Sequence, residues 1–132
     1  MKPVALIAAS DRAHRDHCRH FFARRGFHVR TASSGLECLK MIFQEAPFML
    51  LVDFDILWGG ADGVLACLRN TPELLPQIRF IGATGAGCPA ELSVCSQLPL
   101  ANCFQKPVAP EAILGEVLTV AASGKLERQL VS

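Results

Sequence analysis

The chain has 132 residues, of which 51% are hydrophobic and 19% are charged, so it can bury the core of one domain. A net charge of +1 excludes the strongly basic surface with which many proteins attract nucleic-acid backbones. No apolar run approaches the roughly 20 residues of a membrane helix, and the opening "MKPVALIAAS" is too short for a secretory signal. Six cysteines stand singly in apolar patterns, which favours buried free thiols in a cytoplasmic protein.

Strand-like segments recur along the chain. Two runs of consecutive apolar residues, 4–9 and 48–53, predict strands that are covered on both faces, and the alternating run 27–32 predicts an outer strand. The predicted strands cover residues 4–9, 27–32, 48–53, 78–84 and 101–105.

Helices are predicted between and after these strands. Asp11 is suited to cap a helix that ends before Gly26, and Ser34 with Glu37 has the spacing of a capping box. The predicted helices cover about 11–25, 34–43, 64–69, 89–98 and 110–122, and residues 123–132 are expected to form a C-terminal tail or linker. Five strand–helix units predict an α/β fold, a doubly wound five-stranded parallel sheet with helices on both faces.

Polar side chains follow several of the predicted strands. Asp11 follows the first, Asp53 and Asp55 the third, Thr84 the fourth and Lys106 the fifth. Ligands of such sheets bind beyond the carboxyl ends of the strands, so these groups should meet at one edge. A carboxylate, a hydroxyl and an ammonium suit an oxyanion such as a phosphoryl group, which the carboxylate could accept as a nucleophile.

Two segments carry a resemblance to a known family. "DILWGGADG" and "FQKPVAPEAIL", together with the spacing from Thr84 to Lys106, resemble the receiver domain of two-component response regulators, which has a flavodoxin-like fold. The resemblance covers about residues 4–122. It implies that Lys106 contacts the phosphoryl group, that Pro107 follows a cis peptide bond and that Thr84 is the switch hydroxyl. Cys103 stands where the family usually has an aromatic switch residue.

Two aspartates compete for the place of the phosphoacceptor. Counting forward from Gly35 selects Asp53, whereas counting back from Asp62 and Gly63 selects Asp55. If Asp55 ended the strand, Asp53 would lie one pleat deeper, where an unpaired carboxylate costs several kcal/mol. This argument favours Asp53 and leaves Asp55 as the alternative.

The resemblance also implies Mg²⁺ held by two adjacent acids after the first strand. Ala9 and Ser10 stand at those places, and neither offers a carboxylate to a cation that prefers oxygen ligands. Phosphoryl transfer is therefore expected to be slow or absent. Asp11 and Asp55 could rebuild a metal site, although a role as helix cap competes for Asp11.

Two functions follow from the resemblance. The first is a receiver-like domain in a two-component phosphorelay, which accepts a phosphoryl group on an aspartate from a histidine kinase or phosphotransfer protein. The second is a degenerate receiver, a pseudo-receiver that acts as a phosphorylation-independent protein-interaction module. Either would be no enzyme, would act on a downstream protein target or as a homodimer, and would bind neither nucleic acid nor membrane.

Overall fold

The computed structural model describes residues 2–98 and 100–131, with side chains up to residue 121. Its elements are β1 (Val4–Ala8), α1 (Arg12–Arg24), β2 (His28–Ala32), α2 (Gly35–Gln44), β3 (Met49–Asp53), α3 (Gly60–Arg69), the 3-10 helix η1 (Pro72–Gln77), β4 (Phe80–Gly85), α4 (Pro89–Ser96), β5 (Ala101–Gln105) and α5 (Pro110–Val131). Helix α5 continues to Val131, so residues 123–131 of the expected C-terminal tail are helical. Residue 132 lies outside the described residues.

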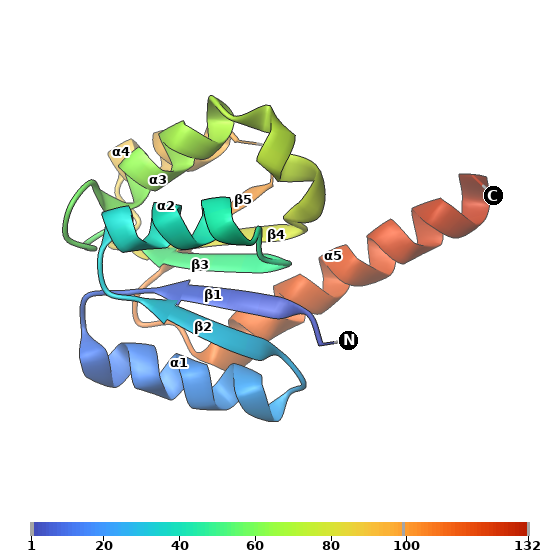
Figure 1. Cartoon of the computed structure of the whole chain (residues 1–132), viewed down its shortest axis with the longest axis horizontal. Coiled ribbons are helices and arrows are strands. Elements are labelled where there is room, and N and C mark those ends of the chain that lie inside the picture. The colour runs from blue at the N-terminus through green and yellow to red at the C-terminus, as the bar shows by residue number, and fades with distance from the viewer. Residues whose placement is uncertain (1, 99, 132) are drawn as a thin grey trace.

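The five strands form one parallel sheet in the order β2-β1-β3-β4-β5. Helices α1 and α5 cover one face, and α2, α3 and α4 cover the other (Figure 1). This arrangement confirms the predicted doubly wound fold. Because every strand runs in the same direction, all five carboxyl ends lie along one edge of the sheet, on the left in Figure 1.

Each face of the sheet has its own apolar core. The α1 and α5 side contains the buried side chains of Phe22 and Ile113, packed on alternate strand residues such as Ile7. The other side contains Ile42 of α2 and Leu68 of α3. Burial of central strands on both faces explains why β1, and β3 up to Asp53, consist of consecutive apolar residues.

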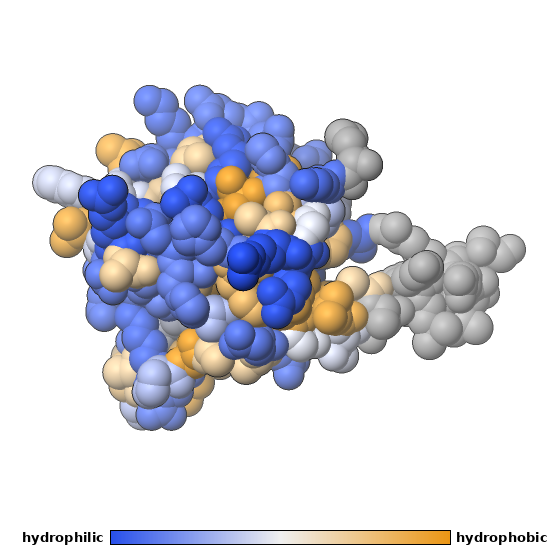
Figure 2. All heavy atoms as spheres, turned by 90° about the horizontal axis from the view of Figure 1, so that it is seen from below, coloured by the Kyte–Doolittle hydropathy of each residue, from blue (hydrophilic) through white to orange (hydrophobic). Residues whose placement is uncertain are grey.

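The outer surface over α1 is largely hydrophilic. Figure 2, which views the molecule from below, shows hydrophilic side chains over most of this face and apolar ones gathered in its middle. Helix α1 buries only Cys18, Phe21 and Phe22, and its arginines and histidines lie mainly toward solvent. No helix in the described part of the chain is both long enough and apolar enough to span a membrane.

The predicted caps are present. The Asp11 carboxylate accepts a hydrogen bond from the His14 backbone N–H at 3.3 Å, and the Ser34 hydroxyl accepts one from the Glu37 N–H at 3.1 Å. Gly26 follows α1 with a φ of 92°, the left-handed conformation that favours glycine after a helix.

Two predictions needed correction. Helix α3 begins at Gly60 rather than near Val64, because Gly59 turns the chain at a φ of 105° and the segment after it is already helical. The cysteines are not all buried: Cys88 is exposed just before α4, and Cys67 and Cys103 are half-buried. An apolar neighbourhood in the sequence therefore did not indicate full burial at these three cysteines.

The loop between β3 and α3 packs directly on the start of α2. The Gly35 N–H donates to the Leu57 carbonyl oxygen at 2.7 Å, and Ser34 forms a β-bridge with Leu57. A Cβ at Gly35 would clash with the carbonyl oxygen of Trp58. The backbone of the loop is therefore held against the start of α2, while the Trp58 side chain is exposed to solvent.

Gly35→Ala should destabilise the fold by about 1–3 kcal/mol, because the new methyl group must displace backbone atoms of the loop. Gly63→Ala in α3 is the matched control. A Cβ there meets nothing within 4 Å, so alanine should stabilise the helix by about 0.5–1 kcal/mol. Urea unfolding measures both changes, and equal effects of the two substitutions would contradict this packing.

Candidate functional site

The predicted site residues meet at the carboxyl edge of the sheet. Asp53 is the last residue of β3, and its Cα pairs with that of Thr84 on the neighbouring strand β4. Both residues are buried. Lys106 follows β5 directly, and its backbone N–H donates to the Gly85 carbonyl oxygen at 2.8 Å. The Lys106–Pro107 peptide bond is cis.

An ion pair joins β3 to the end of β5 across β4. The Lys106 Nζ lies 2.6 Å from Asp53 Oδ2, a short charge-assisted hydrogen bond. The second carboxylate oxygen, Oδ1, accepts the Asp55 backbone N–H at 3.1 Å. Both oxygens of this buried acid therefore have donors, which satisfies the requirement that a buried charge be paired.

The ammonium group is held between two carboxylates. A longer contact of 3.5 Å links Lys106 Nζ to Asp55 Oδ2. Burial lowers the pKa of Lys106, but the hydrogen bond and charge of Asp53, followed by those of Asp55, outweigh it and raise the pKa above its ordinary value. The folded protein thus favours the charged lysine.

The structure separates Asp53 from Asp55 by burial. The Asp53 side chain is 7% exposed at the end of the strand, whereas the Asp55 side chain is 83% exposed in the loop. Asp53 is thus the acid that the strand presents to the edge, in agreement with the burial argument. Asp55 acts from the loop as a weaker, solvated partner of Lys106.

The loop after β1 offers its oxygen atoms to protein donors. The Arg15 guanidinium donates to the Ala9 carbonyl oxygen at 2.8 Å and to that of Ser10 at 3.4 Å. The Ser10 hydroxyl accepts the Leu57 N–H at 3.0 Å. These hydrogen bonds of Arg15 were not predicted from the sequence. The signal that could have suggested them is a cationic residue in the first turn of the helix that follows β1.

The donor set does not fit Mg²⁺. The Asp11 carboxylate accepts the His14 N–H at the start of α1, and those of Asp53 and Asp55 both contact Lys106. Among the side chains that the structure describes, those of residues 2–98 and 100–121, no three histidines, cysteines or acids gather as a metal would require. The predicted pairing of Asp11 with Asp55 as metal ligands gains no support from this geometry, since the helix cap uses the Asp11 carboxylate.

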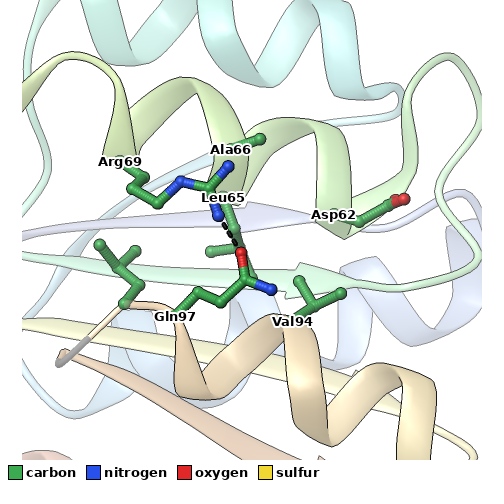
Figure 3. A pocket seen from close by; sticks show the side chains of 7 residues that line it. Asp62, Leu65, Ala66, Arg69, Val94 and Gln97 are labelled. Atoms are coloured by element: carbon green, nitrogen blue, oxygen red, sulfur yellow. Dashed lines mark hydrogen bonds between the residues drawn. The ribbon is translucent and has the colours of Figure 1, made fainter.

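A separate hollow of about 230 Å³ lies between α3 and α4. Figure 3 shows its lining, in which the guanidinium of Arg69 on α3 hydrogen-bonds to the side-chain oxygen of Gln97 at the end of α4. Leu65 and Val94 supply apolar walls. Neither Asp53 nor Lys106 lines this hollow, so it is distinct from the site at the edge of the sheet.

The chain superposes on many solved protein structures, and several of these are response-regulator receiver domains. The chemotaxis protein CheY4 of Vibrio cholerae superposes with a TM-score of 0.79 at 16% identity, over 91% of this chain and 99% of that one. The fold is that of a response-regulator receiver domain. A CheY-like receiver domain from Methanospirillum hungatei gives a TM-score of 0.78 at 22% identity, over 95% and 98% of the two chains.

The receiver fold also matches a receiver domain of a putative LuxO repressor protein from Vibrio parahaemolyticus, with a TM-score of 0.79 at 12% identity. That match covers 100% of this chain and 99% of the other. A scan against protein-family models and a search of curated proteins gave no match. The chain therefore shares the receiver fold with these proteins, and sequence identities of 12–22% show a common fold alone.

The raised pKa of Lys106 predicts a pH dependence of stability. Its contribution should be complete below the unfolded lysine pKa of about 10.4 and lost as the pH rises through the higher folded value. Lys106→Met should cost about 1–2 kcal/mol at neutral pH, because it leaves Asp53 buried and unpaired. Above about pH 10.4 the difference from wild type should shrink.

Urea unfolding at a series of pH values measures this difference, with Lys40→Met on the exposed side of α2 as the control. A constant gap between wild type and Lys106→Met up to the highest pH would show that the lysine does not titrate with folding.

Proposed function

We propose that this chain is a receiver-type module of two-component signalling that accepts a phosphoryl group on Asp53. The observation that supports this proposal best is the Lys106–Asp53 ion pair beside Thr84. These groups supply a nucleophile, a cation and a hydroxyl at one strand edge, which is the set that phosphoryl acceptance needs apart from a metal.

The proposed transfer uses only groups of this chain and of the donor. An Asp53 oxygen attacks the phosphorus of a phosphohistidine, the new P–O bond forms and the P–N bond breaks. The bonding electron pair goes to the imidazole nitrogen of the donor, which takes up a proton. Lys106 neutralises part of the charge on the phosphoryl oxygens, and the Thr84 hydroxyl can hydrogen-bond one of them.

The charge balance sets the expected rate. Lys106 provides the cation that contacts Asp53, and Ala9 and Ser10 supply no carboxylate for a divalent ion. An anionic acceptor must therefore approach an anionic donor with one ammonium to compensate. We expect a slow transfer whose rate does not depend on Mg²⁺, from a histidine kinase or phosphotransfer protein.

The second candidate is a phosphorylation-independent interaction module. It is favoured by the loop after β1, where Arg15 and Leu57 occupy the oxygens of Ala9 and Ser10 with hydrogen bonds. In that case the Lys106–Asp53 pair is structural. In both candidates the chain is no enzyme and passes its signal to a protein target or a second copy, without binding nucleic acid or membrane.

Intact-mass measurement after incubation with a small acyl phosphate, with and without Mg²⁺, separates the two candidates. We expect a single phosphoryl adduct in wild type and Asp55→Asn, none in Asp53→Asn, and the same rate in both buffers. An adduct that survives Asp53→Asn would exclude Asp53 as the acceptor. No adduct in any variant, with folded protein by circular dichroism, would support the interaction module instead.

A further inference from the structure

Helix α2 is apolar on two different sides. Its inner side places Cys38 and Ile42 in the core, whereas its outer side exposes 69% of Leu36 and 56% of Phe43 to solvent. Leu36 and Phe43 are seven residues apart, which is close to two helical turns, so both lie on one face of the helix. In Figure 1 no other element passes over this face. A helix with apolar residues on more than one side is normally covered on each of them.

The loop between β3 and α3 extends this apolar face at the N-terminal end of α2. Leu57 and Trp58 are 62% and 76% exposed, and their backbone packs on Gly35. Trp58 adopts a φ of 60°, a left-handed conformation that is uncommon for a large side chain. Hydrogen bonds from Gly35 and to Ser10 hold Leu57 in place. The loop therefore presents the Trp58 side chain to solvent from a fixed backbone.

The exposed apolar side chains of α2 and this loop form one surface, which we call the α2 patch. It consists of Leu36, Phe43, Leu57 and Trp58. Among the described side chains, the other large apolar ones that are exposed, Leu92 on α4 and Leu118 on α5, lie on separate helices. The α2 patch exposes on the order of 500 Å² of surface. This area matches the weak class of protein interfaces, which bury less than about 600 Å² on each partner.

The charges on the outer side of α2 balance each other. Lys40 lies between Leu36 and Phe43 on the exposed face, and Glu37 lies three residues before Lys40. The Glu37 carboxylate accepts a hydrogen bond from the Ser33 hydroxyl at 3.2 Å, but neither Glu37 nor Lys40 joins an ion pair among the described side chains. A surface with one charge of each sign can be complementary to itself.

We propose that the α2 patch is the interface of a symmetric dimer, in which the α2 helices of two copies of this chain pack antiparallel. A two-fold axis midway between Glu37 and Lys40 brings each of these residues opposite the other one in the second copy. Phe43 of each copy then lies opposite the start of the other helix, where Leu57 and Trp58 adjoin it. The inference goes beyond the proposed function and does not depend on whether Asp53 accepts a phosphoryl group.

The dimer would restrain the loop that leads away from the candidate site. This loop begins directly after Asp53, and Asp55 within it contacts Lys106. Trp58 would be held by the second copy at the other end of the loop. Asp53 and Lys106 are not part of the α2 patch, so the dimer leaves the ion pair in place.

Sedimentation velocity and tryptophan fluorescence at increasing concentrations of the full chain test the proposal. The protein is kept reduced so that the exposed Cys88 does not cross-link copies. The mean sedimentation coefficient should rise from monomer toward dimer, with a dissociation constant on the order of 100 μM. Trp58 is the single tryptophan, so its emission maximum should move to shorter wavelength over the same range as the indole leaves water. A chain that stays monomeric up to about 1 mM would overturn the proposal and would leave the α2 patch to a different protein.

Substitutions of exposed residues locate the interface. Phe43→Ser should raise the dissociation constant at least about tenfold, because the interface loses an aromatic side chain. Leu118→Ser on α5 is the matched control, since Leu118 is 57% exposed but lies outside the α2 patch, and it should leave association unchanged. Circular dichroism checks the fold of both variants. Equal weakening by the two substitutions would show that the interface lies elsewhere, and the proposal would be wrong.

A charge exchange tests the antiparallel arrangement. Glu37→Lys and Lys40→Glu should each weaken self-association, because like charges would then meet across the two-fold axis. An equimolar mixture of the two folded variants should recover association, since each copy offers the charge that the other needs. A mixture that associates no more tightly than either variant alone would overturn the proposed pairing.

Discussion

The arrangement depends on one buried carboxylate and the cation that compensates it. Asp53 ends the central strand β3 with its side chain almost out of reach of water, and such a charge is tolerated in a protein only when it is paired and hydrogen-bonded. Lys106 meets it from the far side of β4 because β3, β4 and β5 are parallel neighbours that end at the same edge. The topology of the sheet thus converts two residues 53 positions apart into one site.

The same edge is held together by donors of the chain itself. Arg15 binds the carbonyl oxygens after β1, and the Leu57 N–H binds the Ser10 hydroxyl, so the loops after β1 and β3 are connected directly. Protein cations and N–H groups occupy the oxygens that could have faced a metal. This is the physical reason to expect chemistry at Asp53, if it occurs, to rely on Lys106 rather than on a divalent ion.

Much of this architecture could be predicted from the sequence. Apolar runs predicted β1 and β3 within one residue, and Asp11 and Ser34 cap the helices as expected, because these signals are local. The energetic cost of burying an unpaired carboxylate also predicted that Asp53, rather than Asp55, ends the strand, and Asp53 is the last residue of β3. The early start of α3 was missed because Gly59 and Gly60 signal a turn without showing where it ends.

A double-mutant cycle between Asp53 and Lys106 tests the central interaction most directly. Asp53→Asn, Lys106→Met and the double variant are unfolded in urea at neutral pH, and a parallel cycle pairs Lys106→Met with Asp55→Asn. We expect a coupling free energy of about 1–2 kcal/mol for Asp53, and less than about 0.5 kcal/mol for the exposed Asp55. A coupling near zero for Asp53, or a larger one for Asp55, would contradict the role assigned to the ion pair.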